Sequence, residues 1–440
     1  MEAIFALATA PGRAAVAVLR LSGADSGQAI ERLTGRPPPS PRRAALRRLV
    51  HDGRVLDEAL VLWFPGPASF TGEDSAELHL HGGKAGIEAV SDALSSLGLR
   101  LAEPGEFTRR AFQNGKLDLS QAEAIADLVD AETESQRRQA LGQLEGELSA
   151  RYQAWRTRLI SALARLEAAV DFPDEDLPDA LDAEVGRLIV ALAGDLEAAL
   201  ADEGRGERVR EGYRIALIGA PNAGKSSLLN RLAGREAAIV TDQPGTTRDV
   251  IEVPAVIDGF KVLFADMAGL RASTDVVEQE GVRRAQAWAE AADLRLWVID
   301  GSTTESDEGL AAALVQAGDI LVLNKADRAR VPRQDGREGL TELDASALSE
   351  QGVDALREAL TGKVGNLAGG DFPAVTRIRH RRHLESAAQS LRRGAEALKR
   401  SPELAAEDLR HAALSLGRIA GRIDPEQILD EVFSSFCIGK

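Results

Sequence analysis

Hydrophobic positions along the chain change their spacing several times, and each spacing predicts a different kind of element. At residues 76–80 apolar and polar side chains alternate, as on a half-buried strand. Apolar runs at 15–21 and 60–64 end at Ser-Gly and Pro-Gly and predict two more strands, whereas residues 85–97 read as a helix. We therefore expect an α/β domain over residues 1–118.

From residue 119 the apolar positions recur every three or four residues. One stripe extends from Leu144 to Val170 and a second from Val185 to Leu200, which predicts two long amphipathic helices. Residues 119–210 are expected to form a helical bundle that is incomplete by itself. Residues 372–440 are helical again and are expected to supply its second half.

Residues 211–371 alternate between strands and helices, which is typical of a doubly wound sheet. We expect this segment to be a Ras-like P-loop domain inserted into the helical domain. Its clearest strands are predicted at 213–218, 260–265, 294–299 and 320–323.

The amino-acid composition restricts the classes of protein to which this chain can belong. The 440 residues are 44% hydrophobic but only 4% aromatic, which favours aliphatic helix packing. No apolar run reaches the ~18–20 residues of a membrane span, and the N-terminus lacks the basic region of a signal peptide. The net charge of −16 argues against general nucleic-acid affinity without excluding a local basic face. A single cysteine, Cys437, excludes an intrachain disulfide and suits the cytoplasm.

The stretch Gly219 to Ser226 fits G-x-x-x-x-G-K-[ST], the phosphate-binding loop, between a predicted strand and a predicted helix. Glycines allow backbone N–H groups to approach phosphate oxygens, and the helix N-terminus adds positive potential. Lys225 would reach the β- and γ-phosphates, and Ser226 would ligate Mg²⁺.

Two further motifs follow predicted strands. Asp266 to Gly269 matches D-x-x-G, whose aspartate would hold Mg²⁺ through water. Asn324 to Asp327 matches N-K-x-D, and a carboxylate there can accept hydrogen bonds from N1–H and the 2-amino group of guanine. Adenine lacks both donors, so Asp327 predicts GTP rather than ATP. Ser346 and Ala347 are expected to back the base.

Between these motifs, residues 242–249 read Asp-Gln-Pro-Gly-Thr-Thr-Arg-Asp, where Thr247 is expected to close over Mg²⁺. Many GTPases place a water-orienting glutamine directly after D-x-x-G. Leu270 occupies that place here. Hydrolysis therefore requires another way to neutralise charge and position water.

Several of these motifs resemble the tRNA-modification GTPase family MnmE, also called TrmE. The resemblance covers the whole chain. Its most specific segments are Gly245 to Asp249, Asp266 to Arg271 and the terminal Phe436 to Lys440, joined by 70–74 and 116–124 near the N-terminus.

The resemblance implies a cytoplasmic homodimer that works with an FAD-containing partner, MnmG, as a heterotetramer. Together they would build the carboxymethylaminomethyl or aminomethyl group on the wobble uridine of tRNA. The N-terminal domain would bind 5-formyltetrahydrofolate or a related tetrahydrofolate. The GTPase domains would meet in a potassium-dependent way to hydrolyse GTP to GDP.

For the nucleotide site, the resemblance implies that K⁺ supplies the charge that Leu270 leaves missing. Asn222, with oxygens near Thr241, Gln243 and Thr246, would ligate K⁺, and Glu278 would orient the attacking water. The residues alone favour a solvated helix glutamate at Glu278. The full set expected to contact GTP or its metals is Asn222, Ala223, Gly224, Lys225, Ser226, Ser227, Thr241, Asp242, Gln243, Pro244, Gly245, Thr246, Thr247, Asp266, Met267, Ala268, Gly269, Asn324, Lys325, Asp327, Ser346 and Ala347.

For the folate site, a pterin presents an N3–H beside a 2-amino group, which one carboxylate can bind. Glu77 matches that family residue, and Arg20, Lys116 and Lys440 match its other ligands. The residues alone favour surface ion pairs. Cys437 is a candidate functional thiol, although a chance free thiol is the default. Met267 departs from the family's usual threonine, and its side chain is expected to point away from phosphate.

Three alternatives stay open at this point. The basic run 377–383 reads equally well as a solvated helix face and as a contact for tRNA phosphates. A ribosome-assembly GTPase would need an RNA-binding domain that the sequence does not display. A nucleotide-controlled scaffold without hydrolysis is motivated by Leu270 and Met267.

Overall fold

The computed structural model describes most of the chain, and its contacts divide the chain into two compact units. The first comprises Met1–Ala126, Gln143–Gly194 and His383–Lys440, and the second Asp127–Gly142 and Asp195–Arg382. The four-segment division that we expect from the sequence stays a prediction. The described residues are 2–171, 180–202, 204–234, 251–267, 276–303, 309–331, 339–349, 351–370, 372–398, 400–421, 429, 432–433 and 436–439.

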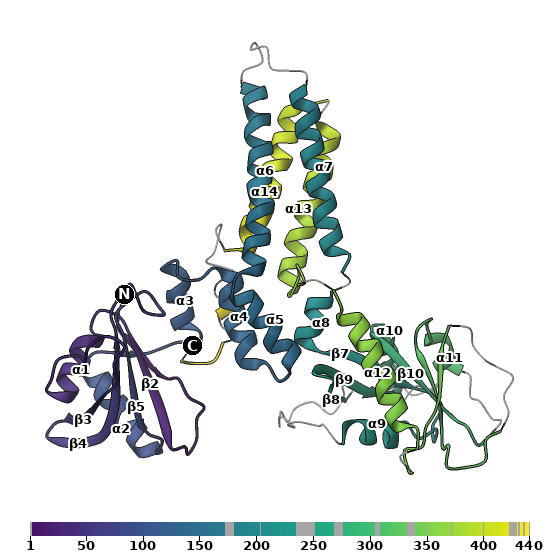
Figure 1. Cartoon of the computed structure of the whole chain (residues 1–440), viewed down its shortest axis with the longest axis horizontal. Coiled ribbons are helices and arrows are strands. Elements are labelled where there is room, and N and C mark those ends of the chain that lie inside the picture. Colours follow the sequence, from purple (N-terminus) through teal and green to yellow (C-terminus); the bar gives the residue numbers. More distant parts are fainter. Residues whose placement is uncertain are drawn as a thin grey trace. The chain divides into compact units, whose positions relative to one another are not determined.

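The first unit contains a six-stranded sheet in the order β3-β4-β5-β2-β1-β6 (Figure 1). Neighbouring strands are antiparallel except for β1 and β6, which run parallel. The strands are β1 (Ile4–Leu7), β2 (Val16–Ser22), β3 (Ala45–His51), β4 (Arg54–Phe64), β5 (Ser75–His81) and β6 (Arg100–Leu101).

One face of this sheet is apolar and the other carries charge. Helices α1 (Ser26–Thr34) and α2 (Lys84–Ser96) bury their apolar residues in one cluster with Leu19 and Leu78. Because side chains alternate along a strand, the neighbouring residues Arg20 and Glu77 lie on the opposite face. The register of β2 and β5 places these two residues directly across from each other.

The helical part of the first unit brings together segments that are far apart in the sequence. Helix α6 (Glu147–Asp171) packs along α14 (Pro402–Ile419), and Figure 1 shows α7 (Ala180–Leu200) and α13 (Ile378–Ala397) beside them. Gly146, with φ of 97°, separates α6 from α5 (Glu134–Leu144), so the stripe predicted from Leu144 is divided between two helices.

The second unit is built on another six-stranded sheet, in the order β12-β11-β10-β7-β9-β8. All neighbours are parallel except β8, which is antiparallel to β9. The strands are β7 (Tyr213–Ile218), β8 (Glu252–Ile257), β9 (Phe260–Asp266), β10 (Leu294–Asp300), β11 (Ile320–Asn324) and β12 (Thr341–Asp344).

Helices cover both faces of this sheet. On one face α9 (Lys225–Ala233) and α12 (Val353–Ala368) share a core cluster with Leu296 and Val298 of β10. On the other, α10 (Val276–Glu290) and α11 (Gly309–Leu314) share a cluster with Trp297. Successive residues of one strand thus enter opposite cores, which confirms the doubly wound α/β fold within a multidomain α/β and helical chain.

The remaining helices of the described residues are short or join larger elements: α3 (Glu106–Gln113), α4 (Leu119–Asp130) and α8 (Arg205–Glu211). Within the described residues, no helix combines the length and the apolar character that crossing a membrane would require.

The strands and the 85–97 helix predicted from apolar patterning are present to within a few residues at their ends, except that β4 begins at Arg54 and not at residue 60. The sequence reading missed β1, β3, β6, β8 and α1. In β3 two adjacent arginines interrupt the alternation, and β6 is only two residues long. Such edge strands form through pairing with a neighbouring strand, which a local pattern does not encode.

Candidate functional site

The phosphate-binding loop joins β7 to α9 at the carboxyl edge of the parallel strands, where ligands bind in open α/β sheets. A Cβ atom at Gly219 would lie 2.1 Å from the Val298 carbonyl oxygen, so only glycine fits there. Asn222 and Gly224 take positive φ of 65° and 92°. The loop geometry therefore requires glycine where its backbone passes Val298.

Lys225 opens α9 and its side chain is directed back into the loop. Its ammonium donates hydrogen bonds to the carbonyl oxygens of Gly219 at 2.9 Å and Ala220 at 3.0 Å, and the residue is buried. A buried cation beside the N-terminus of α9 creates strong positive potential inside the loop. This arrangement suits a multiply charged phosphate group.

Ser226 and Asp266 lie together at the ends of two adjacent elements. The Ser226 hydroxyl donates a hydrogen bond to Oδ2 of Asp266, which ends β9. The other carboxylate oxygen, Oδ1, is buried without a hydrogen-bond partner. A hydroxyl beside a carboxylate with one unsatisfied oxygen is a donor set that fits Mg²⁺.

Asn324, the last residue of β11, connects the phosphate loop to the loop expected to back the base. Its amide nitrogen donates to the Ala223 carbonyl oxygen at 2.7 Å, and its amide oxygen accepts from the Ala347 N–H at 3.3 Å. A Cβ at Gly224 would lie 2.2 Å from that amide nitrogen. The glycine of one motif thus makes room for the asparagine of the other.

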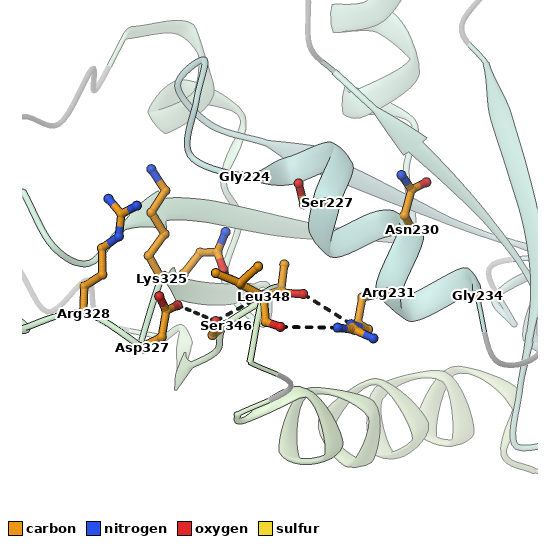
Figure 2. A pocket seen from close by; sticks show the side chains of 12 residues that line it. Gly224, Ser227, Asn230, Arg231, Gly234, Lys325, Asp327, Arg328, Ser346 and Leu348 are labelled. Carbon is orange, nitrogen blue, oxygen red and sulfur yellow. Dashed lines mark hydrogen bonds between the residues drawn. The ribbon is translucent and has the colours of Figure 1, made fainter.

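Asp327 lies in a cavity of about 570 Å³ that also includes Asn324, Ser346 and Gly224 (Figure 2). The Ser346 hydroxyl donates to the Asp327 carboxylate and lowers the pKa of that carboxyl. The same hydroxyl accepts from the N–H groups of Leu348 at 3.2 Å and Ser349 at 3.1 Å. An ionised acceptor held in this way can bind the two donors of a guanine edge.

Two residues that the sequence reading missed also belong to this region. Asp300 ends β10 beside Asn324, and its carboxylate lies 2.6 Å from the Lys325 ammonium. Arg231 donates to the carbonyl oxygens of Ala347 at 3.2 Å and Leu348 at 3.4 Å, as Figure 2 shows. A charged residue at the carboxyl end of a parallel strand was the available signal for Asp300, whereas Arg231 carries no such signal.

Burial would raise the pKa of Asp300, but hydrogen bonds from Lys325 and Ser302 outweigh it and lower that pKa to about 2. The carboxylate is therefore charged at neutral pH and forms a charge-assisted bond to Lys325. Lys325 also takes a positive φ of 66°, a conformation that an L-residue rarely adopts.

Several expected nucleotide residues lie outside the described residues. Glu278 is in α10, but its side chain is not among the described ones. Met267 is described, and its side chain is buried in the apolar cluster with Ile218, so only its backbone is available to a nucleotide. The expected nucleotide residues outside the description are Thr241, Asp242, Gln243, Pro244, Gly245, Thr246, Thr247, Ala268 and Gly269. The expected folate ligand Lys440 also lies outside it.

A second cavity, of about 430 Å³, lies in the first unit and is lined by Arg20, Glu77 and Lys116 together with two phenylalanines. Arg20 pairs with Glu77 at 3.2 Å, and His79 lies 3.1 Å from the other Glu77 oxygen. The ion pair that the residues alone favoured is thus present. Both of its members nevertheless face a cavity large enough for a small ligand.

The C-terminal segment contacts the N-terminal part of the first unit. A Cβ at Gly439 would lie 2.3 Å from the Leu7 carbonyl oxygen, and the Gly105 N–H donates to the Cys437 carbonyl oxygen at 3.4 Å. The Cys437 residue itself is exposed. Leu7 lies on β1, one residue from the partner of Arg20, so the segment that leads to Lys440 packs near the strand that carries Arg20.

The basic run at 377–383 is partly neutralised within the second unit. Arg377 pairs with Asp127 at 2.6 Å, and Arg381 pairs with Glu207 at 3.1 Å. These contacts support the structural reading for two of its arginines. Among the described residues, no group of three or more His, Cys, Asp and Glu side chains is arranged to hold a metal ion.

Comparison with known proteins adds the family. A model described as the GTP-binding protein TrmE N-terminus matches residues 3–116, and one described as the MnmE helical domain matches residues 119–437. The chain is 59% identical over 446 residues to the tRNA modification GTPase MnmE of Caulobacter vibrioides, covering 100% of both chains. It is 56% identical over 450 residues to that of Phenylobacterium zucineum, again covering 100% of both.

Two solved structures also match part of the chain. The G domain of the FeoB iron transporter of T. maritima matches at 24% identity and a TM-score of 0.28, covering 36% of this chain and 99% of that one. Era of Aquifex aeolicus bound to GDP·AlF4⁻ matches at 24% identity and a TM-score of 0.27, covering 40% and 66%. The full-length relatives and the two family models are decisive: the chain belongs to the MnmE (TrmE) family of tRNA modification GTPases.

Proposed function

We propose that this chain is a K⁺-activated GTPase whose hydrolysis of GTP to GDP drives modification of the wobble uridine in tRNA. It would act as a cytoplasmic homodimer together with the FAD-containing partner MnmG. The observation that carries the proposal is the meeting of three motifs at one sheet edge: Lys225 in the phosphate loop, Asp266 at the end of β9, and Asp327 beside Ser346.

The nucleotide chemistry follows from these contacts. Lys225 and the amides at the start of α9 bind the phosphates, while Asp327 selects guanine. Ser226 and Asp266 are the residues that would hold Mg²⁺, which supplies charge neutralisation at the phosphates when bound. The unsatisfied Asp266 oxygen supports this assignment.

K⁺ would supply the positive charge that an arginine supplies in other GTPases, because negative charge spreads over the phosphoryl oxygens in the transition state. Asn222 is the described residue that would hold it. Its side chain is exposed at the top of the phosphate loop, where a positive φ of 65° turns the backbone. The chain's membership of the MnmE (TrmE) family is the second support for K⁺ activation.

The second cavity is the proposed site for a tetrahydrofolate that donates the one-carbon unit. Glu77 would accept from the N3–H and 2-amino group of the pterin, as Asp327 would from guanine. The neighbouring Phe70 lines the same cavity and offers an apolar face for a flat ring. The packing of Gly439 against Leu7 supports Lys440 as a further ligand.

GTP turnover measured in KCl and in NaCl at equal ionic strength tests the hydrolytic part. We expect faster turnover in KCl, loss of that stimulation in Asn222→Ala, and its retention in the control Asn230→Ala, a residue of α9 that lines the cavity with Asp327. Equally slow turnover in both salts would refute K⁺ activation and favour a nucleotide-controlled scaffold.

The coupling is tested by incubating the chain with purified MnmG, unmodified tRNA, GTP, 5-formyltetrahydrofolate, ammonium or glycine as the amine and NADH as the reductant, followed by nucleoside analysis. We expect modified uridine only when all components are present. An active GTPase that yields no modified uridine in the complete mixture would contradict the tRNA role.

A further inference from the structure

We propose that Arg42 is an anion-binding residue of the second cavity and that it selects tetrahydrofolates carrying a glutamate tail over those lacking one. The inference rests on the proposed folate role of that cavity. No sequence motif indicates Arg42, which precedes β3 and is exposed. Its role emerges from where the guanidinium lies.

The Arg42 guanidinium is held at the wall of the cavity by two contacts. It lies 5.9 Å from the centre of the Phe64 ring and donates a hydrogen bond to the Ala68 carbonyl oxygen. Phe64 and Ala68 both line the cavity. The Arg42 backbone is also anchored, because its N–H donates to the Trp63 carbonyl oxygen at 2.9 Å. The charged group is thus oriented before any ligand arrives.

The charges lining the cavity are unbalanced. Its lining contains three cations, Arg20, Arg42 and Lys116, but a single carboxylate, Glu77. That carboxylate is already paired with Arg20 at 3.2 Å. Neither Arg42 nor Lys116 has a carboxylate partner within the described part of the chain, and each donates to a backbone carbonyl. Two cations without a counter-charge favour an anionic ligand.

These two cations converge on one turn. Lys116 donates to the Pro67 carbonyl oxygen at 3.1 Å, and Arg42 donates to that of the next residue, Ala68. Both cations are therefore held at successive carbonyl groups of the same turn. The glutamate tail of a folate carries two carboxylates, and a planar guanidinium can bind one of them through two parallel hydrogen bonds. Glu77 remains available for the heterocycle.

The competing explanation is that Arg42 only holds the turn at residues 67–68. Binding of two ligands by the same variant separates the two roles. We would measure the affinity of the full-length chain for 5-formyltetrahydrofolate and for the primary amide of 5-formyltetrahydropteroate, which lacks the glutamate and carries no carboxylate, by isothermal titration calorimetry. The variants are Arg42→Gln, Arg42→Lys and the control Arg43→Gln, an exposed neighbour.

We expect the wild-type chain to prefer the glutamate-bearing ligand by about tenfold or more, since hydrogen bonds to charged groups are the stronger class. Arg42→Gln should remove most of this preference and leave the affinity for the tail-less ligand unchanged. Arg42→Lys should keep part of the preference, and Arg43→Gln all of it.

Equal losses for both ligands in Arg42→Gln would overturn the proposal in favour of a purely structural role, and so would an unchanged preference. If Arg42→Gln does not fold, a reduced preference in Arg42→Lys supports the proposal and full retention overturns it. A wild-type chain that binds neither ligand refutes the folate site itself, which distinguishes that failure from a wrong assignment of Arg42.

Discussion

Replacing Asp300 by alanine should weaken binding of both GTP and GDP, although Asp300 belongs to none of the nucleotide motifs. Its carboxylate lies 2.6 Å from the Lys325 ammonium and accepts from the Ser302 N–H at 3.0 Å and hydroxyl at 2.6 Å. The substitution removes all three bonds at once. Lys325 then loses the contact that holds it at the edge of the cavity.

The magnitude follows from the burial of the pair. The Asp300 and Lys325 side chains are 18% and 25% exposed, so the contact is largely shielded from water. A hydrogen bond to a charged group contributes about 1.5–3 kcal/mol. Without it, nucleotide binding must order the Lys325 loop, and that free energy is subtracted from binding. We expect the affinity to fall by about tenfold or more, since 1.4 kcal/mol corresponds to a factor of ten.

Equilibrium titration with a fluorescent GDP or GTP analogue measures this effect. Glu342→Ala is the matched control: Glu342 also forms an ion pair at 2.6 Å, with Arg330, but these side chains are 42% and 55% exposed. Such exposed pairs contribute ~0–1 kcal/mol, so the control should bind as the wild type does. If Asp300→Ala also binds nucleotide with wild-type affinity, Lys325 is positioned without Asp300 and the reasoning is wrong.

Three further predictions concern the same domain. Gly219→Ala should lower the free energy of unfolding by ~1–3 kcal/mol or more in urea denaturation, because its Cβ would lie 2.1 Å from the Val298 carbonyl oxygen; an unchanged midpoint would contradict the loop geometry. Asp327→Asn should shift preference from guanosine to xanthosine nucleotides, and unchanged GTP affinity would refute its role. Because folding lowers the pKa of Asp300 from 3.8 to about 2, its ionised carboxylate stabilises the folded state at pH values above 3.8. This stabilisation is lost as the pH falls from 3.8 toward about 2. The stability advantage of the wild type over Asp300→Asn should therefore narrow on acidification through that window, whereas a constant difference would exclude this linkage.

The sequence alone was sufficient to predict those sites whose residues are neighbours along the chain. A strand, a glycine loop and a helix follow one another from Tyr213 to Ala233, so the local pattern carries nearly all the information needed to predict them. Asn324 and Asp327 are likewise encoded next to each other after a buried strand. The family could be recognised for the same reason, since its motifs are short and local.

Contacts between residues that are far apart in the sequence could be found only in the folded structure. Asp300 reaches Lys325 because the parallel strands β10 and β11 end beside each other at one edge of the sheet. Arg231 reaches Ala347 because α9 packs into the core cluster against which Ala347 lies. Arg42 contacts the turn at Ala68 through its side chain, and no pattern of residue spacing in the sequence predicts this contact. A hydrogen bond or ion pair depends on separations of about 3 Å, and such separations between residues tens or hundreds of positions apart are set by packing alone.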